Sequence, residues 1–428
     1  MKIKRLQTPA TMIPKGVKDL LPVRAAKVDH IEETLRKVFL RWGCQRLIPA
    51  GLEFLHVLEQ GLGRNLQRRT FRFDDRQSGE LVAIPPDMTP QVARIFATRM
   101  QELPLPVRLY YSGHVLRHAE QQAGKDREIA QAGAELIGAP DAAADGEMIA
   151  MAIDCLQSVG AGDFTIDIGQ VEFFRGIMEE LPLSGEAAQQ VQGAIAHKDA
   201  RGLARLLDAH NLRDELREAL LALPRLFGGR EVLDLAAKVA LNDRTRRALE
   251  NLSRVLDVLV RYGVEDRITL DLGELRGLDY HTGVSFQGFV PGAGSAVLSG
   301  GRYDNLTARY GRPAPATGFT VNIFSLLFAL DRELETRVSR ASDVLVVQAG
   351  ADKAAAQKLA AALRARGYCA VHDIIDRDLA ASRYYAQIMH FRYVAIVDEG
   401  RDVRLIATQD NTERVLPLDG MLASDFSL

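Results

Sequence analysis

The sequence predicts an α+β protein: an antiparallel sheet core with a helical insertion, followed by a small C-terminal α/β domain. Three observations carry this prediction. Short strand-like runs separated by turn residues fill the first part of the chain, the stretch from about 171 to 263 has helical periodicity with almost no strand signal, and strands alternate with helices from Ser342 onward. We expect a core domain over residues 1–335 and a second domain over 341–428, because 428 residues are too many for one ordinary domain.

The first predicted helix runs from about Arg24 to Trp42. Its apolar residues recur at helical spacing and form one face: Val28, Ile31, Leu35, Val38, Phe39 and Trp42. Strand-like runs follow at 70–73, 81–84 and 107–111, and further strands are predicted at 164–168 and 268–272. Gly, Asp and Pro residues separate several of these runs, which favours antiparallel pairing.

The helical insertion is predicted from Leu- and Ala-rich segments such as GLARLLDAH and ENLSRVLDVLVRYG. Beyond it, the charged and poorly periodic stretch from Asp331 to Arg340 is the expected junction. The C-terminal strands are predicted at 343–347, 368–371 and 393–397, with helices between them. This alternation indicates a largely parallel sheet.

Composition excludes several classes of protein. No apolar run approaches the roughly 20 residues that cross a bilayer, and the basic N-terminus, MKIKRLQTPATMIPKG, has no apolar signal segment, so we expect a cytoplasmic protein. The cysteines Cys44, Cys155 and Cys369 form no metal-binding cluster, which favours reduced thiols, and no metal or cofactor is predicted. The net charge of −2 argues mildly against a nucleic-acid-binding protein and leaves open a local basic patch.

Three polar clusters are candidates for chemistry. The first is Asp87, which lies between prolines in the string IPPDMTP. The second contains Gln131, Gly133 and Glu135, which share one face if the segment is a strand, so that Gly133 would leave space between two polar groups. The third is LRGLDYHTG at 275–283, echoed by SGGRYD at 299–304.

Each cluster also has a purely structural interpretation. A proline-flanked Asp is usually a turn residue or a helix cap, alternating polar residues on a strand usually face solvent, and an Arg-Gly pair is usually a loop. Their combination, however, matches one kind of ligand, the zwitterion of an amino acid. Its ammonium group needs Asp or Gln oxygens, its carboxylate needs Arg, and a polar side chain needs Glu, Tyr or His.

The motifs identify a family. The chain resembles histidyl-tRNA synthetases and their paralogues, the regulatory subunits of ATP phosphoribosyltransferase, over essentially its whole length. The resemblance rests on PKG followed by DLLP at 14–22, on QAGAE at 131–135, on RGLDY at 276–280 and on GGRYD at 300–304. It implies the antiparallel-sheet core of class II aminoacyl-tRNA synthetases and a C-terminal domain like their anticodon-binding domain.

The resemblance also implies a histidine-binding site and roles for its residues. The family's equivalents of Gln131 and Thr89 hold the α-amino group, the equivalent of Glu135 reads the imidazole, and Arg276 matches an arginine near the substrate carboxylate. Asp87 stands where the synthetases have Glu and the regulatory subunits usually have Asp. The full predicted set is Asp87, Thr89, Arg117, Gln131, Glu135, Arg276, Tyr280, His281 and Tyr303.

Departures from the synthetase pattern concern ATP and the ligand ring. Arg117 is followed by His118 and Ala119, where the second class II motif has an adenine-contacting Glu. Phe324 and Ser325 stand where the third motif has Glu-Arg. The loss of placed positive charge weakens phosphoryl chemistry, although Arg127 still matches a loop arginine of the second motif. His281 replaces a tyrosine that contacts the imidazole.

Together these features indicate a protein that binds histidine but does not activate it with ATP. The resemblance implies a non-catalytic regulatory subunit that assembles with the short catalytic subunit of ATP phosphoribosyltransferase and makes it active and sensitive to L-histidine. It also implies a homodimer. Residues 341–428 contain 10 Lys/Arg against 12 Asp/Glu, which is unfavourable for a tRNA-binding surface. A histidine–tRNA ligase with unusual ATP contacts is the alternative enzyme, and a paralogue with another role, such as a stress sensor, is a third possibility.

Overall fold

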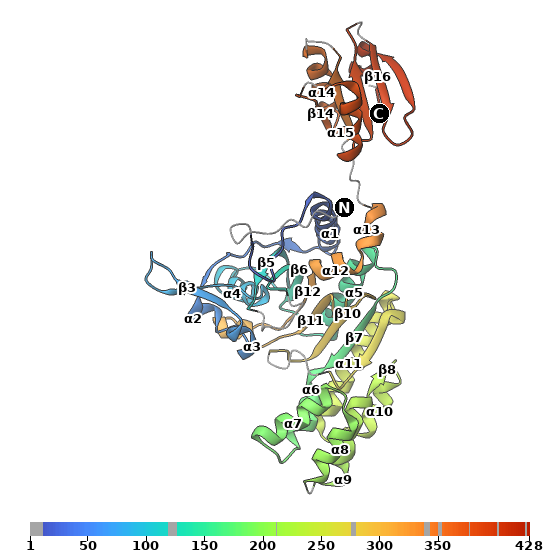
Figure 1. Ribbon diagram of the computed structural model, residues 1–428. Helices are drawn as coiled ribbons and strands as arrows, with labels where there is room; N and C mark the ends of the chain where they lie inside the picture. Colours follow the sequence, from blue (N-terminus) through green and yellow to red (C-terminus); the bar gives the residue numbers. More distant parts are fainter. Residues whose placement is uncertain are drawn as a thin grey trace. The chain divides into compact units, whose positions relative to one another are not determined.

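The chain folds into two compact units, Met1–Glu335 and Thr336–Leu428 (Figure 1). The computed structural model describes residues 12–118, 126–210, 212–274, 280–337, 343–349, 353–375, 377–399, 402–423 and 426–428. Within these ranges, no helix is both long and apolar enough to cross a membrane.

The first unit is built on a large sheet, which has nine strands within the described residues. In spatial order they are β1 (Gln45–Arg46), β5 (Val107–Leu116), β6 (Glu128–Ile137), β12 (Ala316–Asn322), β11 (Leu298–Arg302), β10 (Val284–Phe289), β7 (Thr165–Gln170), β9 (Ile268–Asp271) and β8 (Phe227–Gly228). The predicted antiparallel core is confirmed for the central pairs from β5 to β7.

Two pairs depart from the antiparallel prediction. β1 runs parallel to β5, and β7 runs parallel to β9. β7 and β9 are the strands predicted at 164–168 and 268–272, and the whole helical segment lies between them in the sequence. A crossover of that length allows the chain to enter the sheet again in the same direction, whereas a short turn would force it to reverse.

Helices cover one face of the large sheet. They are α1 (Pro22–Arg41), α5 (Ala142–Ser158), α11 (Asp243–Tyr262) and α12 (Ile323–Ala329). α1 begins two residues before its predicted start because Pro22, which has no N–H to satisfy, suits the first turn of a helix. Its Phe39 ring packs against those of Tyr110 and Phe319, with centroids 5.4 and 6.1 Å apart.

The opposite face of β5 packs against α4 (Thr89–Arg99). Side chains alternate along a strand, so Leu109 and Tyr111 face away from Tyr110 and join Val92 and Phe96 of α4 in a buried cluster. A small sheet of β2 (Glu53–Phe54), β4 (Leu81–Ile84) and β3 (Phe71–Asp74) precedes α4, with α2 (Leu55–Leu58) and α3 (Arg64–Arg68) beside it. This packing brings the segment after β4, which carries Asp87, onto the face of the large sheet.

The segment predicted as a helical insertion is helical in the structure, apart from the two-residue strand β8. Its helices are α6 (Val171–Glu179), α7 (Gly185–Ala196), α8 (Ala200–Asp208), α9 (Asp214–Ala222), α10 (Val232–Lys238) and α11. α11 packs along α5 as part of the layer on the sheet, whereas α7 to α10 extend below the sheet in Figure 1.

Side chains of the Gly300–Asp304 stretch point to opposite faces of the large sheet. Tyr303 points into the cavity described below, whereas the Arg302 side chain, 5% exposed, reaches Asp145 of α5, which is 1% exposed. Arg302 Nε donates to Asp145 Oδ1 and Oδ2 at 3.1 and 3.0 Å, and its Nη1 donates to the Ala139 carbonyl at 3.2 Å. Arg302 therefore ties the sheet to α5 and is not among the residues that line the cavity.

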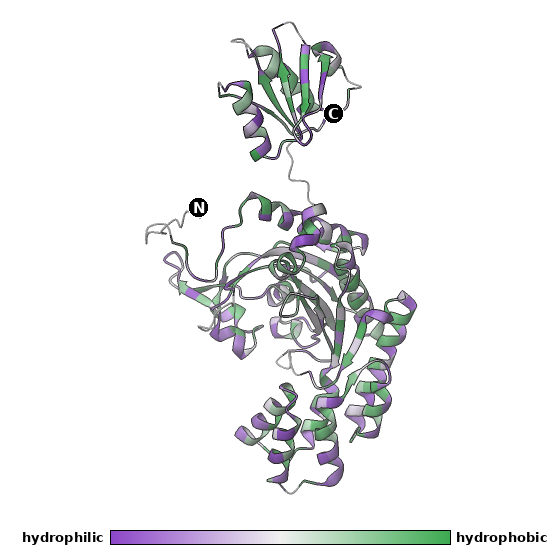
Figure 2. Ribbon diagram, turned by 45° about the vertical axis from the view of Figure 1, so that its right-hand side comes forward, coloured by the Kyte–Doolittle hydropathy of each residue, from purple (hydrophilic) through white to green (hydrophobic). Residues whose placement is uncertain are grey.

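The second unit is a five-stranded sheet, counted within the described residues, with helices on both faces. Its strands are β14 (Ala370–His372), β13 (Val344–Gln348), β15 (Tyr393–Val397), β16 (Asp402–Ala407) and β17 (Glu413–Pro417), and its helices are α14 (Ala354–Ala365), α15 (Leu379–Ile388) and α16 (Leu418–Leu422). Val344 and Val346 pack against α14, and Leu345 and Val347 pack on the α15 side. In Figure 2, green hydrophobic stretches dominate these strands.

The prediction of a largely parallel C-terminal sheet was wrong for its second half. β14, β13 and β15 are parallel, but β15, β16 and β17 are antiparallel. The short turn between β16 and β17 can only reverse the chain. The sequence reasoning had not identified either strand.

Replacing Asp145 by Ala should destabilise the first unit by about 3 kcal/mol, because the buried Arg302 charge then keeps only the more exposed Asp304 as a carboxylate partner. Urea denaturation of the first unit measures this loss. Arg36→Ala, which breaks an exposed pair on α1, should leave the urea midpoint almost unchanged. The double substitution Asp145→Leu with Arg302→Met should recover most of the loss, and a single variant as stable as the wild type would contradict the assignment.

Candidate functional site

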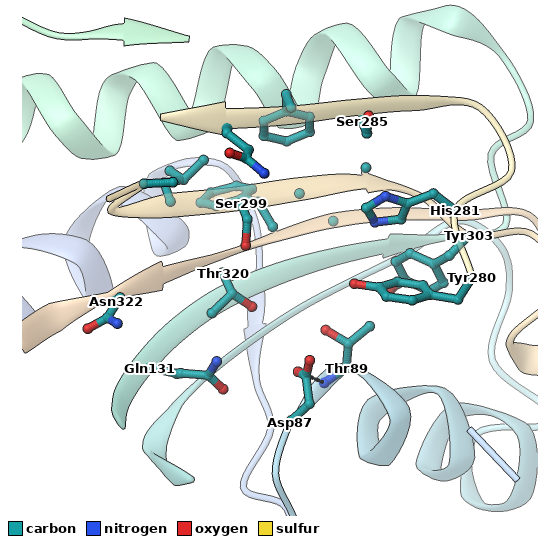
Figure 3. A pocket seen from close by; sticks show the side chains of 18 of the residues that line it. Asp87, Thr89, Gln131, Tyr280, His281, Ser285, Ser299, Tyr303, Thr320 and Asn322 are labelled. Atoms are coloured by element: carbon teal, nitrogen blue, oxygen red, sulfur yellow. Dashed lines mark hydrogen bonds between the residues drawn. The ribbon is translucent and has the colours of Figure 1, made fainter. Parts of the chain in front are cut away.

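A cavity of about 350 Å³ opens above the centre of the large sheet. Strands β6, β7, β10, β11 and β12 form its floor and walls, and the segments that follow β4 and precede β10 close its sides. In Figure 3, Tyr280, His281 and Tyr303 lie on one side of the cavity, and Gln131, Thr320 and Asn322 lie on the other.

The cavity brings together most of the side chains predicted from the sequence. Its lining includes Asp87, Thr89, Arg117, Gln131, Glu135, Tyr280, His281 and Tyr303. These residues come from two stretches of the sequence, 87–135 and 280–303. They meet because β6 lies between β5 and β12 in the sheet. Arg276, the ninth predicted residue, lies outside the described residues, as does Ala119.

Glu135 is the centre of a buried hydrogen-bond cluster. Its carboxylate, 1% exposed, accepts from the Thr89 hydroxyl at 2.8 Å, from the Tyr111 hydroxyl at 3.3 Å and from the Tyr303 hydroxyl. A carboxylate can be buried only if such donors replace water. The three hydroxyls come from α4, β5 and the segment after β11, so this one side chain joins three separate elements.

The space above Gly133 is filled by protein, which corrects the expectation that this glycine leaves room for a ligand. Gly133 pairs directly with Tyr111 across the β5–β6 ladder. A Cβ at Gly133 would lie 2.5 Å from the Tyr111 hydroxyl. The glycine therefore allows the tyrosine to cross the strand and reach Glu135 and the Thr320 hydroxyl, which lies 2.7 Å from its own.

Gly318 of β12 is required by the same cluster. It pairs with Glu135 across the β6–β12 ladder, and a Cβ at this position would lie 1.6 Å from Glu135 Oε2. Any larger residue would push the carboxylate out of its place. Sequence reasoning missed Tyr111, Thr320 and Gly318, because their roles follow from strand register.

Burial dominates the electrostatics of this cluster. It raises the pKa of Glu135 to about 8, although the hydrogen bonds from Tyr303, Thr89 and Tyr111 oppose the shift and the nearby Asp87 adds to it. Burial also raises the pKa values of Tyr111 and Tyr303 well above their ordinary range, and the Glu135 charge adds to both shifts. The tyrosines thus remain hydroxyl donors.

Asp87 and Arg117 form the polar edge of the cavity. Asp87 Oδ1 accepts from the backbone N–H of Thr89 at 3.2 Å, so the aspartate stabilises the turn into α4 as well as lining the cavity. Arg117 Nε donates to the Pro86 carbonyl at 2.6 Å, and its Nη2 lies 3.9 Å from Asp87 Oδ2. Asp87 therefore has the structural role of a turn residue and also faces the cavity.

Gln131 contributes an acceptor. Its side chain is 5% exposed, and its Oε1 has no hydrogen-bond partner within the described part of the chain. A buried acceptor that lacks a partner is unfavourable by about 1–3 kcal/mol, so a ligand donor beside it would restore the lost hydrogen bond.

His281 forms part of the opposite wall as a neutral imidazole. Burial, followed by the positive charge of Arg175, lowers its pKa to about 4. Its ring centroid lies 4.4 Å from that of Tyr280, and a Cβ at Gly301 would lie 3.0 Å from the imidazole Nε2. Its Nδ1 has no partner within the described residues. A tyrosine hydroxyl at this position would offer different hydrogen bonds.

The cavity also has an acidic end that the sequence analysis did not identify. Asp167 of β7, Asp271 of β9 and Glu274 line it. Burial raises the pKa of Asp167, and the charge of Asp271 contributes to the shift, while Lys198 opposes it. No group of His, Cys, Asp or Glu side chains in the described ranges is arranged to hold a metal ion.

The raised pKa of Glu135 predicts a pH dependence of stability. Between its ordinary pKa of 4.5 and the folded value of about 8, the folded state binds more protons than the unfolded state. The free energy of unfolding should therefore fall as the pH rises through this interval, relative to Glu135→Gln, which cannot ionise. Urea midpoints of both proteins from pH 5 to 9 test this. Parallel pH profiles would contradict a buried, protonated Glu135.

Comparisons with known proteins agree on the family. The family model described as histidyl-tRNA synthetase matches residues 16–326. The chain is 58% identical to the ATP phosphoribosyltransferase regulatory subunit of Syntrophotalea carbinolica over 99% of this chain and 100% of that protein. It is 49% identical to the regulatory subunit of Geobacter metallireducens over 97% of both chains.

A solved structure shows the same fold. It is that of an ATP phosphoribosyltransferase regulatory subunit/histidyl-tRNA synthetase from Bacillus halodurans, with a TM-score of 0.79 and 27% identity over 92% of this chain and 99% of that chain. The large sheet, its helices and the smaller C-terminal domain thus form a histidyl-tRNA synthetase-like fold. The chain belongs to the family of ATP phosphoribosyltransferase regulatory subunits and, by its family model, to the wider histidyl-tRNA synthetase family.

Proposed function

We propose that this chain is the non-catalytic regulatory subunit of ATP phosphoribosyltransferase. It assembles with the short catalytic subunit, makes it active in the first step of L-histidine biosynthesis and makes it sensitive to inhibition by histidine. The names of its full-length relatives support the subunit role. One observation carries the histidine part of the proposal: a single cavity holds the side chains that suit a histidine zwitterion.

In this proposal each end of histidine has a partner in the cavity. The α-ammonium group donates to Asp87 and to the free acceptor of Gln131, and the carboxylate is attracted by Arg117. The imidazole lies toward Glu135, Tyr280 and His281. Thr89, which the resemblance associates with the α-amino group, donates its hydroxyl to Glu135 in this structure, so its proposed contribution is to hold Glu135 in place.

The same cavity is poorly suited to ATP. Asp167, Asp271 and Glu274 line one end of it, and although Lys198 pairs with Asp271, this excess of carboxyl groups disfavours a triphosphate. Ser325, where the synthetases have an ATP-contacting Arg, lies in the first turn of α12 with its backbone N–H bound to the Asn322 side chain at 3.0 Å. We therefore propose that the site binds the amino acid and does not activate it.

Two further proposals concern assembly and RNA. The subunit forms a two-fold dimer through its synthetase-like core, because self-complementary two-fold contacts are the commonest assembly. Its C-terminal domain does not bind tRNA, since residues 341–428 contain 12 acidic against 10 basic residues.

Glu135→Ala should weaken histidine binding by about 2–5 kcal/mol, because it leaves the ligand's buried polar group without a partner. The reconstituted complex with this variant should stay active at histidine concentrations that stop the wild-type complex. Calorimetry of the isolated chain and inhibition curves of the complex measure the two effects. Gln131→Leu removes an acceptor without disturbing the hydroxyl cluster and should also weaken binding, whereas Ala at the exposed Glu250 of α11 should change neither measurement. Loss of binding with unchanged inhibition would place the sensor elsewhere.

The protein should not catalyse histidine-dependent exchange between ATP and pyrophosphate, because Ser325 offers no positive charge for the phosphates. The assay uses the purified chain with histidine, ATP and labelled pyrophosphate, beside a histidyl-tRNA synthetase as a positive control. Exchange at a rate close to that of the control would instead support the alternative, a histidine–tRNA ligase.

A further inference from the structure

The two described ends of the β9–β10 connection, residues 271–274 and 280–283, contribute to the cavity wall and are both bound by the helical segment 171–263. Asp271 begins this connection and lines the cavity, and His281 lies near its other end and also lines the cavity. Lys198 binds the first end, and Arg175 binds the second.

At the first end, Lys198 makes both an ion pair and a cation–π contact. It lies in the turn between α7 and α8 with φ of +54°, a region that residues other than glycine seldom adopt. Its Nζ donates to Asp271 Oδ2 at 2.7 Å and lies 4.6 Å from the centroid of the Phe227 ring, and Phe227 pairs with Asp271 in the sheet. The other oxygen of Asp271 accepts from the Gly273 N–H at 3.1 Å.

The Lys198–Asp271 bond is more than an ordinary surface ion pair. The Lys198 side chain is 45% exposed, but that of Asp271 is 9% exposed. A half-exposed lysine alone would contribute little. Here its partner Asp271 is almost buried, lines the cavity and also accepts the Gly273 N–H. The bond therefore joins the α7–α8 turn directly to the cavity wall.

At the second end, α6 makes two bonds to the wall. The guanidinium of Arg175 donates to the His281 carbonyl at 2.9 Å, and the Val171 N–H donates to the Gly283 carbonyl at 3.0 Å. Arg175 is itself held by Glu172 at 2.8 Å, and Glu172 accepts from Arg244 of α11 at 2.7 Å. The backbone of His281 is therefore placed by the helical segment.

From this arrangement we propose that Lys198 and Arg175 are positioning residues, through which the helical segment and the ligand site influence each other. They hold the two ends of the β9–β10 connection in the conformation that binds the ligand. If either bond is lost, ligand binding must fix the position of that end, and affinity falls for that reason. By reciprocity, a bound ligand restrains the α7–α8 turn and α6. This inference rests on the proposed function only in taking histidine as the ligand.

The test compares Lys198→Met and Arg175→Met with the wild type and with two reference variants. Lys198→Arg keeps the charge and should behave like the wild type. Arg217→Met removes an ion pair with Asp208 that lies within the helical segment and away from the cavity, so it controls for simple loss of a surface bond. Thermal denaturation of all variants identifies any general destabilisation.

Hydrogen exchange of the ligand-free, full-length protein provides a measurement that needs no ligand. Peptides that cover β9 and the turn at 280–284 should exchange faster in Lys198→Met and Arg175→Met than in the wild type, and Arg217→Met should leave their exchange unchanged. Unchanged exchange in both Lys198→Met and Arg175→Met would overturn the inference, whatever the protein binds.

Calorimetry with L-histidine provides the second measurement. Both variants should bind histidine about 5-fold more weakly or worse, while Lys198→Arg and Arg217→Met bind it as the wild type does. Affinities equal to that of the wild type would also overturn the inference. A wild type that binds no histidine would contradict the proposed function, and the exchange measurement would then decide the inference by itself.

Discussion

The buried carboxylate of Glu135 is the constraint on which the centre of the first unit depends. A charged or protonated carboxyl group in the middle of a sheet is tolerated only when donors surround it. Three hydroxyls meet this need, and they come from α4, β5 and the segment after β11. The cluster also accounts for two glycines: Gly133 makes room for Tyr111, and Gly318 makes room for the carboxylate itself. Packing and polarity are thus coupled, because moving any one of these elements would leave a buried polar group without a partner.

Around this centre the cavity divides electrostatically. Asp87, Gln131 and Arg117 present the mixed polarity that an amino-acid zwitterion requires, and His281 adds a neutral ring. The far end is acidic and joined to the helical segment through Lys198. This division favours a small zwitterion over a nucleotide. It also connects the cavity to the helical segment 171–263, through which the proposed ligand would influence the rest of the subunit.

Local sequence patterns predicted the elements whose signals lie within a few residues. The strands at 81–84 and 393–397 have the predicted bounds, and the apolar face of α1 from Val28 to Phe39 is buried. Sequence patterns were less informative about whether two strands run parallel or antiparallel, because this depends on the length of the chain between them. β7 and β9 proved parallel because a long helical crossover separates them, and the β16–β17 hairpin was missed because its alternating polar residues resemble an exposed loop.

By itself, the sequence determined the two units, the first helix, the helical segment and the polar residue types of the site, because periodicity and motifs are properties of neighbouring positions. Only the tertiary structure decided which of these residues meet. Arg302 stands beside Tyr303 in the GGRYD motif, yet it turns to Asp145 of α5 while Tyr303 turns to Glu135. Tyr111, Thr320, Asp271 and Lys198 carry no local signal, since their roles arise from strand register and from contacts across long separations in the chain. The physical reason is that burial and hydrogen-bond partners are set by the packing of distant elements, and local patterns do not contain that packing.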